Sequence, residues 1–163
     1  MNKQLSTNTL QSHASHYALT ALHSGYVNPQ GLMTLNNGII KSISGQTATL
    51  PKSAAKCVTT LTSHFKAIAN NQRHDDISHN CRIFATALNM PPDAWQLISL
   101  IAVLESNVGL MDFVRHVMPH DLSAEGLIAS MAGVDENSLM SIISSLEETG
   151  IFEPSCISLL DFI

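Results

Sequence analysis

The chain of 163 residues has 45% hydrophobic and 13% charged residues and a formal net charge of −5 at pH 7. This composition can form the packed core of one domain or two small ones, and no apolar run reaches the roughly 18 residues that a membrane span needs. No secretory signal follows Met1, and Cys57, Cys81 and Cys156 are odd in number and far apart, so we expect a cytoplasmic protein with buried, reduced thiols.

Residues 1–50 predict an N-terminal helical segment. Apolar residues recur at helical spacing over 10–26, and Gly25 is expected to end that helix. Residues 31–43 are ambiguous, because their apolar residues fit a helical stripe while Asn37-Gly38 between two short apolar runs is typical of a β-hairpin. We favour a helix there, since every other segment predicts one, and leave the hairpin open.

Residues 51–118 predict a helical bundle made of four consecutive helices. The first runs from Pro51 to Asn70, with the proline in its first turn, and a shorter one covers 77–88. The third runs from Pro92 to about Ser106 and is apolar nearly all round, so we expect it at the centre of the domain. The fourth covers 110–118.

Residues 119–163 predict a winged-helix-like unit. Two helices are expected over residues 124–131 and 136–149, then a short strand over 151–153 and, over 157–163, another strand or a last helical turn. Ser123 and Asp135 are suitable N-caps for the helices, and Gly150 is suited to a left-handed C-cap. The predicted fold class is therefore mainly α, a helical bundle with a C-terminal winged-helix-like unit and at most a short hairpin.

The charge of this C-terminal unit argues against a nucleic-acid partner. Residues 116–163 hold eight acids and no Lys or Arg, whereas residues 1–115 hold five acids and eight bases. A DNA-reading helix normally presents Arg, Lys, Asn or Gln to bases, and basic neighbours to phosphates. We predict instead that the exposed side of the second helix docks a protein partner, through Glu136, Asn137, Ser141, Ser144, Glu147 and Glu148.

Two positions of that second helix bear on the docking prediction. Glu147 and Glu148 lie at its C-terminal end, where the helix dipole disfavours acids. This placement hints at a basic partner surface, although a merely solvated helix end is the simpler interpretation. Met140 is expected on the opposite, buried side of the helix with Leu139.

No residue set has the spacing of an active site or a metal centre. His13 and His16 lie three apart and His116 and His120 four apart, but a third ligand and the His-Glu-x-x-His motif are missing. Asp75-Asp76 beside histidines fits helix capping better than acid–base chemistry. Nucleophile and phosphate-loop motifs are absent as well. We therefore assign no catalytic, cofactor-binding or metal-binding residue and expect this chain to be non-catalytic.

Residues 77–163 resemble the helical region that precedes the ATPase core in a group of bacterial AAA+ ATPases. The resemblance rests on Phe84–Trp95 (FATALNMPPDAW), Leu97–Val117, Leu127–Asp135, Ser138–Phe152 and Ser158–Asp161. It implies a non-catalytic N-terminal domain that engages a protein substrate, an adaptor or a neighbouring domain. It also implies that ATP and Mg²⁺ bind to a part of the protein outside these 163 residues, because this chain has no phosphate loop.

Two alternatives remain open. One is a winged-helix DNA-binding transcription regulator with basic contacts in the N-terminal half, at Lys41, Lys52, Lys56, Lys66 and Arg73. The other is a small enzyme or effector whose site has no recognisable motif. The apolar residues near the end, Leu159, Leu160, Phe162 and Ile163, lead us to expect a longer polypeptide, or an end that packs against a neighbouring element.

Overall fold

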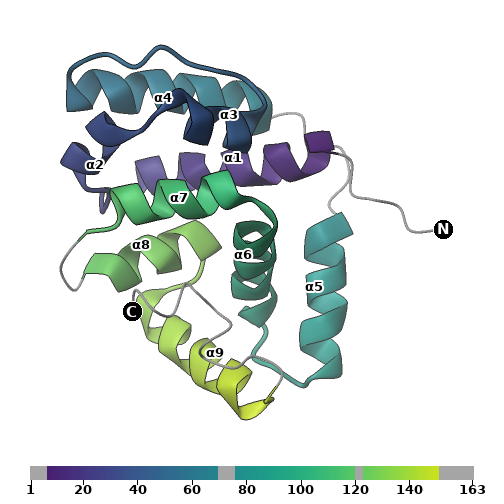
Figure 1. Ribbon diagram of the computed structural model, residues 1–163. Helices are drawn as coiled ribbons and strands as arrows, with labels where there is room; N and C mark the ends of the chain where they lie inside the picture. Colours follow the sequence, from purple (N-terminus) through teal and green to yellow (C-terminus); the bar gives the residue numbers. More distant parts are fainter. Residues whose placement is uncertain (1–6, 70–75, 120–122, 151–163) are drawn as a thin grey trace.

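Helices form all the regular secondary structure in the described residues of the computed structural model, which are 7–69, 76–119 and 123–150 (Figure 1). The helices are α1 (Thr7–His23), α2 (Pro29–Thr34), α3 (Asn37–Ser44), α4 (Ala54–Ala69), α5 (Asp76–Ala87), α6 (Ala94–Ser106), α7 (Val108–Val117), α8 (Ser123–Ala132) and α9 (Glu136–Glu148). The prediction of a mainly α fold is confirmed. The short elements predicted after residue 150 lie outside the described residues.

The ambiguous segment 31–43 is helical, as favoured. It forms parts of two helices, α2 and α3, and not one continuous helix. Leu35 and Asn36 have extended backbone and separate α2 from α3. The Asn36 side chain accepts a hydrogen bond from the backbone N–H of Ile39 at 3.1 Å, so it caps α3. Asn37-Gly38 consequently starts a helix, and the hairpin alternative is wrong at this position.

Both prolines that were predicted inside first helical turns lie ahead of their helices. Helix α4 starts at Ala54, and the Ser53 carbonyl accepts the N–H of Cys57 at 2.8 Å. Pro92 lies in a turn before α6, in which the N–H of Ala94 donates to the Pro91 carbonyl at 3.0 Å. The fixed φ of proline suits a turn as well as a first helical turn, so the residue alone does not decide between them.

Helix α6 lies near the middle of the molecule, as its apolar composition predicted (Figure 1). Eight of its residues are buried, among them Leu97, Leu100 and Leu104. They belong to one apolar cluster that includes buried residues from every described helix. The division of the chain at residues 50 and 118 stays a prediction, and residues from all three of its parts contribute to this cluster.

Close contacts tie α2 and α3 to α7. Gly31 of α2 lies so near the end of α7 that a Cβ atom there would be 1.7 Å from the carbonyl oxygen of His116. Gly109 of α7 also lies close against α3, since a Cβ atom there would be 2.4 Å from Cβ of Ser42 and 3.0 Å from the carbonyl oxygen of Ile39. The Asn107 side chain also donates to the Ser42 carbonyl at 3.1 Å. Glycine at these positions allows the helices to approach backbone to backbone.

Helix α9 begins at the residue that the sequence predicts and ends one residue before the predicted end. The Asp135 carboxylate accepts the N–H of Ser138 at 2.9 Å, and Gly150 has a φ of 63°. The predicted N-cap and the predicted left-handed residue after the helix are therefore confirmed. Helix α8 starts at Ser123 itself, so the predicted cap lies at the first helical residue.

The cap of α9 predicts a stability effect that depends on pH. Hydrogen bonds from the side chain and backbone of Ser138 lower the pKa of Asp135. Their stabilisation is complete above the pKa of an unfolded aspartate, about 3.9, and is lost as the pH falls through the lower folded-state pKa. We expect Asp135→Ala to lower Tm at pH 7, and the difference from the unsubstituted protein to vanish in strong acid.

The matched control for this substitution is Asp93→Ala. Asp93 precedes α6 in the same way, but its side chain makes no capping hydrogen bond. Thermal unfolding followed by circular dichroism between pH 2 and 7 measures both variants. An equal, pH-independent change in the two would contradict the capping argument.

Candidate functional site

The six predicted docking residues lie on one exposed face of α9, at the lower edge of the molecule in Figure 1. They are Glu136, Asn137, Ser141, Ser144, Glu147 and Glu148, and each is exposed. Two adjacent pairs, 136/137 and 147/148, and the residues 141 and 144 recur at spacings of three or four along the helix, which places all six on one side of it. Met140 lies among them with 46% of its surface exposed, so its predicted burial is wrong. We call these seven residues the acidic face.

One residue of the acidic face is held in place by the N-terminal half of the chain. The Tyr26 hydroxyl donates a 2.9 Å hydrogen bond to Oε1 of Glu136, across 110 positions of sequence. This hydrogen bond raises the pKa of Tyr26, because the carboxylate stabilises the protonated phenol. Gly126 lies beneath the pair, where a Cβ atom would be 2.6 Å from the Tyr26 ring. No local pattern in the sequence points to a role for Tyr26.

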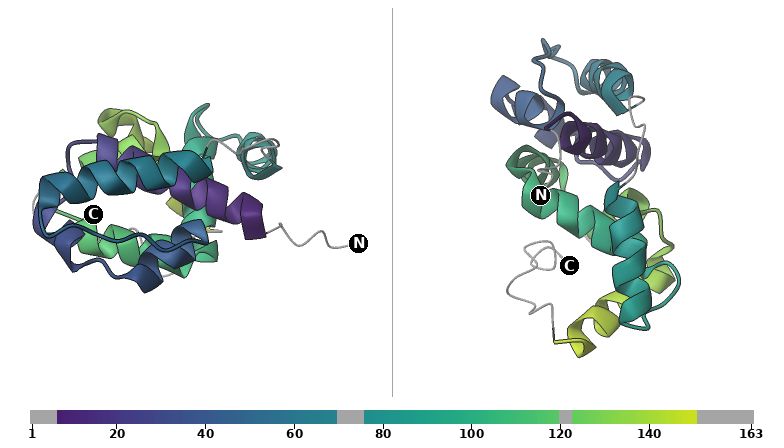
Figure 2. Two further views of the ribbon diagram at one scale, coloured as in Figure 1. Left: turned by 90° about the horizontal axis from the view of Figure 1, so that it is seen from above. Right: turned by 90° about the vertical axis from the view of Figure 1, so that its right-hand side faces the viewer.

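Charges of opposite sign collect at opposite ends of the described structure. Residues 123–150 carry five carboxylates and no Lys or Arg, whereas residues 7–69 carry four lysines and no Asp or Glu. All four lysines, Lys41, Lys52, Lys56 and Lys66, are exposed. Helices α4 and α9 lie at opposite ends of the molecule in both Figure 1 and the right-hand view of Figure 2. The acidic face is therefore remote from the lysines on α3 and α4.

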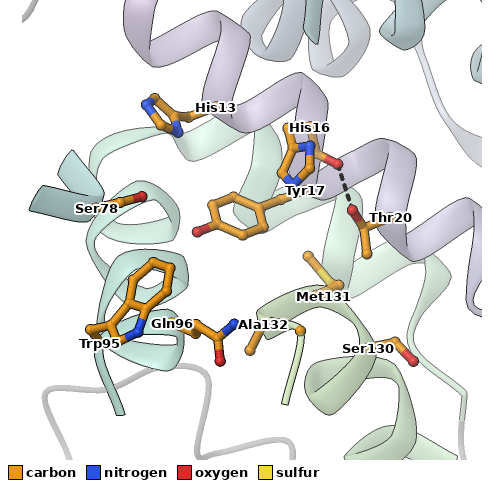
Figure 3. Close-up of a pocket in the computed structure, with 11 residues that line it drawn as sticks. His13, His16, Tyr17, Thr20, Ser78, Trp95, Gln96, Ser130, Met131 and Ala132 are labelled. Carbon is orange, nitrogen blue, oxygen red and sulfur yellow. Dashed lines mark hydrogen bonds between the residues drawn. The ribbon is translucent and has the colours of Figure 1, made fainter. Parts of the chain in front are cut away.

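A pocket of about 390 Å³ lies where α1, α5, α6 and α8 meet (Figure 3). We call it the polar pocket, and its lining residues are His13, His16, Tyr17, Thr20, Ser78, Trp95, Gln96, Ser130, Met131, Ala132 and Gly133. None of these lining residues is Lys, Arg, Asp or Glu. These residues come from segments that are distant along the chain, so no local sequence pattern predicts that they line one pocket.

Aromatic rings and hydrogen-bonding groups share the polar pocket. Tyr17 extends from α1 toward the side where Ser78 and Trp95 lie, and Met131 lines the side formed by α8 (Figure 3). The rings of His16 and Tyr17 meet edge to face, with centroids 5.6 Å apart. This arrangement suits a ligand with an aromatic ring and polar edges better than an aliphatic one.

Trp95 separates the polar pocket from a second cavity. It also lines this second cavity, of about 240 Å³, together with Arg82. The Arg82 guanidinium carbon lies 4.0 Å from the centre of the Trp95 ring, a cation–π contact. A positive charge is therefore fixed against the indole ring just outside the polar pocket.

The described residues do not group into a metal-ligand set. No three His, Cys, Asp or Glu side chains come together within residues 7–69, 76–119 and 123–150. His13 and His16 both border the polar pocket, while Nδ1 of His116 lies 2.7 Å from the Asp112 carbonyl. Its proposed pair partner, His120, lies outside the described residues, as does Asp75.

Two further sequence predictions concern the cysteines and membrane spans. Cys57 and Cys81 are buried, as predicted, while Cys156 lies outside the described residues. In the part of the chain that the structure describes, no single helix has the length and hydropathy to cross a membrane. Helices α6 and α7 meet that test only as a pair, and the chain bends by 107° between them.

A serine–histidine contact joins α3 to α4. Oγ of Ser44 lies 2.8 Å from Nε2 of His64, and burial lowers the pKa of His64. Such a pair is the minimum for nucleophilic catalysis, but Ser44 is only 4% exposed and also lies 2.8 Å from the Ile40 carbonyl. Because a substrate has no access to this hydroxyl, we interpret the contact as a structural link between the helices.

No protein-family model, no curated protein and no solved structure is significantly similar to this chain. The resemblance of residues 77–163 to a region of AAA+ ATPases therefore stays a proposal.

Proposed function

We propose that the chain is a non-catalytic helical domain whose acidic face docks a basic segment of a protein partner. The observation that carries this proposal is the composition of the acidic face, which has three exposed carboxylates and no opposing Lys or Arg along α9. Exposed Met140 among them offers an apolar contact. Lys and Arg side chains have both an apolar stem and a charged head, so a basic amphipathic segment complements this surface.

The resemblance to AAA+ ATPases suggests the larger protein to which this domain would belong. In that setting the domain works in the cytoplasm and engages a substrate, an adaptor or a neighbouring domain, while ATP and Mg²⁺ bind elsewhere in the protein. We also propose that α8 and α9 are the helix-turn-helix of a winged-helix unit. The transcription-regulator alternative would use α9 to read DNA, and its exposed carboxylates would repel phosphates.

The test compares two double variants that remove the same net charge. Glu147→Gln/Glu148→Gln neutralises the end of the acidic face, and Asp76→Asn/Asp93→Asn neutralises two exposed carboxylates near α5 and α6. The probe is a fluorescent Lys- and Arg-rich amphipathic peptide, titrated at several salt concentrations. We expect the first variant to bind it about threefold to tenfold more weakly, and the second to bind nearly as the unsubstituted chain does.

Three outcomes would contradict the proposal. Equal weakening in both double variants would show a general charge effect without a docking face. Tight, salt-sensitive binding of a duplex oligonucleotide would favour the transcription regulator. Self-association that Glu147→Gln/Glu148→Gln abolishes would identify a second copy, with its lysines at α3 and α4, as the partner.

A further inference from the structure

We infer that the polar pocket binds an uncharged, planar heteroaromatic compound of nucleobase or nucleoside size. This inference is independent of the docking proposal, because the pocket shares no residue with the acidic face. It rests on the convergence of ring, amide and hydroxyl groups from four helices around one cavity.

The size of the polar pocket sets the size of its ligand. Cavities that bind small molecules typically measure about 300–1,000 Å³, so a volume of about 390 Å³ falls at the small end of that range. A single heterocycle, with or without a sugar, fits such a volume. An extended cofactor or a peptide does not fit inside it.

The lining of the polar pocket sets the chemistry. Trp95 is partly exposed and offers aromatic surface against which a flat ring can pack, while the largely buried Tyr17 and Met131 form the wall beside it. The Gln96 amide can both donate and accept, as can the Ser78 hydroxyl. A heterocycle with ring nitrogens, exocyclic amino groups or carbonyls matches both kinds of surface.

The charges around the polar pocket disfavour ionic ligands. No carboxylate lines it to pair with a cation, and the Arg82 guanidinium against Trp95 would repel one. No Lys or Arg lines it to pair with an anion, so a phosphate inside the cavity would meet hydrogen-bond donors but no permanent opposite charge in the pocket wall. We therefore expect a nucleoside to bind at least as tightly as its monophosphate.

Trp95 makes the inference directly testable, because it is the one tryptophan in the chain. Its fluorescence reports on the polar pocket in the full chain without a label. The probes are adenine, adenosine, guanosine, cytidine and uridine, with adenosine monophosphate as the charged comparison and maltose as a neutral, non-aromatic one. We expect saturable quenching by at least one base or nucleoside, confirmed by calorimetry, and none by maltose.

Three variants locate the binding. Gln96→Leu keeps the side-chain size but removes the amide, and we expect at least a tenfold loss of affinity. Thr20→Leu adds bulk at the pocket wall and should weaken binding similarly. Thr59→Leu is the matched control, since Thr20 and Thr59 each donate to the carbonyl four residues earlier but Thr59 lies on α4 away from the pocket. It should leave the affinity unchanged.

The inference is overturned if none of the bases or nucleosides changes Trp95 fluorescence saturably at millimolar concentration. Binding that survives both Gln96→Leu and Thr20→Leu, in variants with native circular dichroism spectra, would also overturn it. Binding of the monophosphate alone would refute the uncharged class. Glu147→Gln/Glu148→Gln should not affect this titration, so failure here is distinguishable from failure of the docking proposal.

Discussion

Gly31→Ala is expected to destabilise the folded chain by about 3 kcal/mol or more, because helices α2 and α7 would have to separate. The added Cβ would lie 1.7 Å from the carbonyl oxygen and 2.7 Å from the carbonyl carbon of His116. These are backbone atoms, so no side-chain rotation relieves the overlap. The shift would also strain the nearby hydrogen bond from the Asn28 N–H to the Val117 carbonyl, which is 2.8 Å long.

Urea unfolding of Gly31→Ala and of a control, Gly25→Ala, measures this effect. Gly25 has a φ of 79° and nothing within 4 Å of an added Cβ, so its substitution tests backbone strain without a clash. We expect it to cost only about 1 kcal/mol. If Gly31→Ala were no more destabilising than Gly25→Ala, the close approach of α2 to α7 would be wrong.

Phe113→Ala is the second substitution with a large expected effect, about 3–5 kcal/mol. The Phe113 ring on α7 is fully buried, and so is the Phe65 ring on α4. The two rings pack edge to face, with centroids 6.0 Å apart and an interplanar angle of 86°. Truncation would remove this contact and leave a cavity between the two helices.

A double-mutant cycle with Phe65→Ala isolates the ring–ring contact. Its coupling energy should be about 0.5–1.5 kcal/mol beyond the separate losses of burial. The exposed control is Ile83→Ala, whose side chain is 56% exposed and should change stability by less than about 0.5 kcal/mol. A small loss from Phe113→Ala, comparable with that of Ile83→Ala, would argue against the burial of the Phe113 ring against Phe65.

The sequence predicted those features of the fold that depend on neighbouring residues. Asp135 and Gly150 mark the ends of α9 because a cap and a left-handed residue act on the backbone next to them. Asn36 was overlooked as a cap, and the following Asn37-Gly38 was therefore open to a hairpin interpretation. The prediction that Pro51 starts a helix was wrong because proline is equally compatible with the irregular segment that precedes α4.

The candidate sites also have one part that local sequence patterns predict and another that depends on tertiary packing. Helical periodicity placed the six docking residues on the exposed side of α9, but Met140, which lies among them, was assigned to the buried side because it is apolar. The Tyr26–Glu136 hydrogen bond and the polar pocket depend on how distant helices pack. A single sequence contains no local signal for such tertiary contacts.

The separation of lysines from carboxylates along the molecule gives the described structure a permanent electric dipole. When a charged protein diffuses toward this one, the electric field orients the two molecules relative to each other before they make contact. At physiological ionic strength this field decays over about 8 Å, so the orientation is selected only in the last nanometre of the approach. Encounter rates with a basic protein should accordingly fall steeply as salt is added, even where the final complex buries apolar surface.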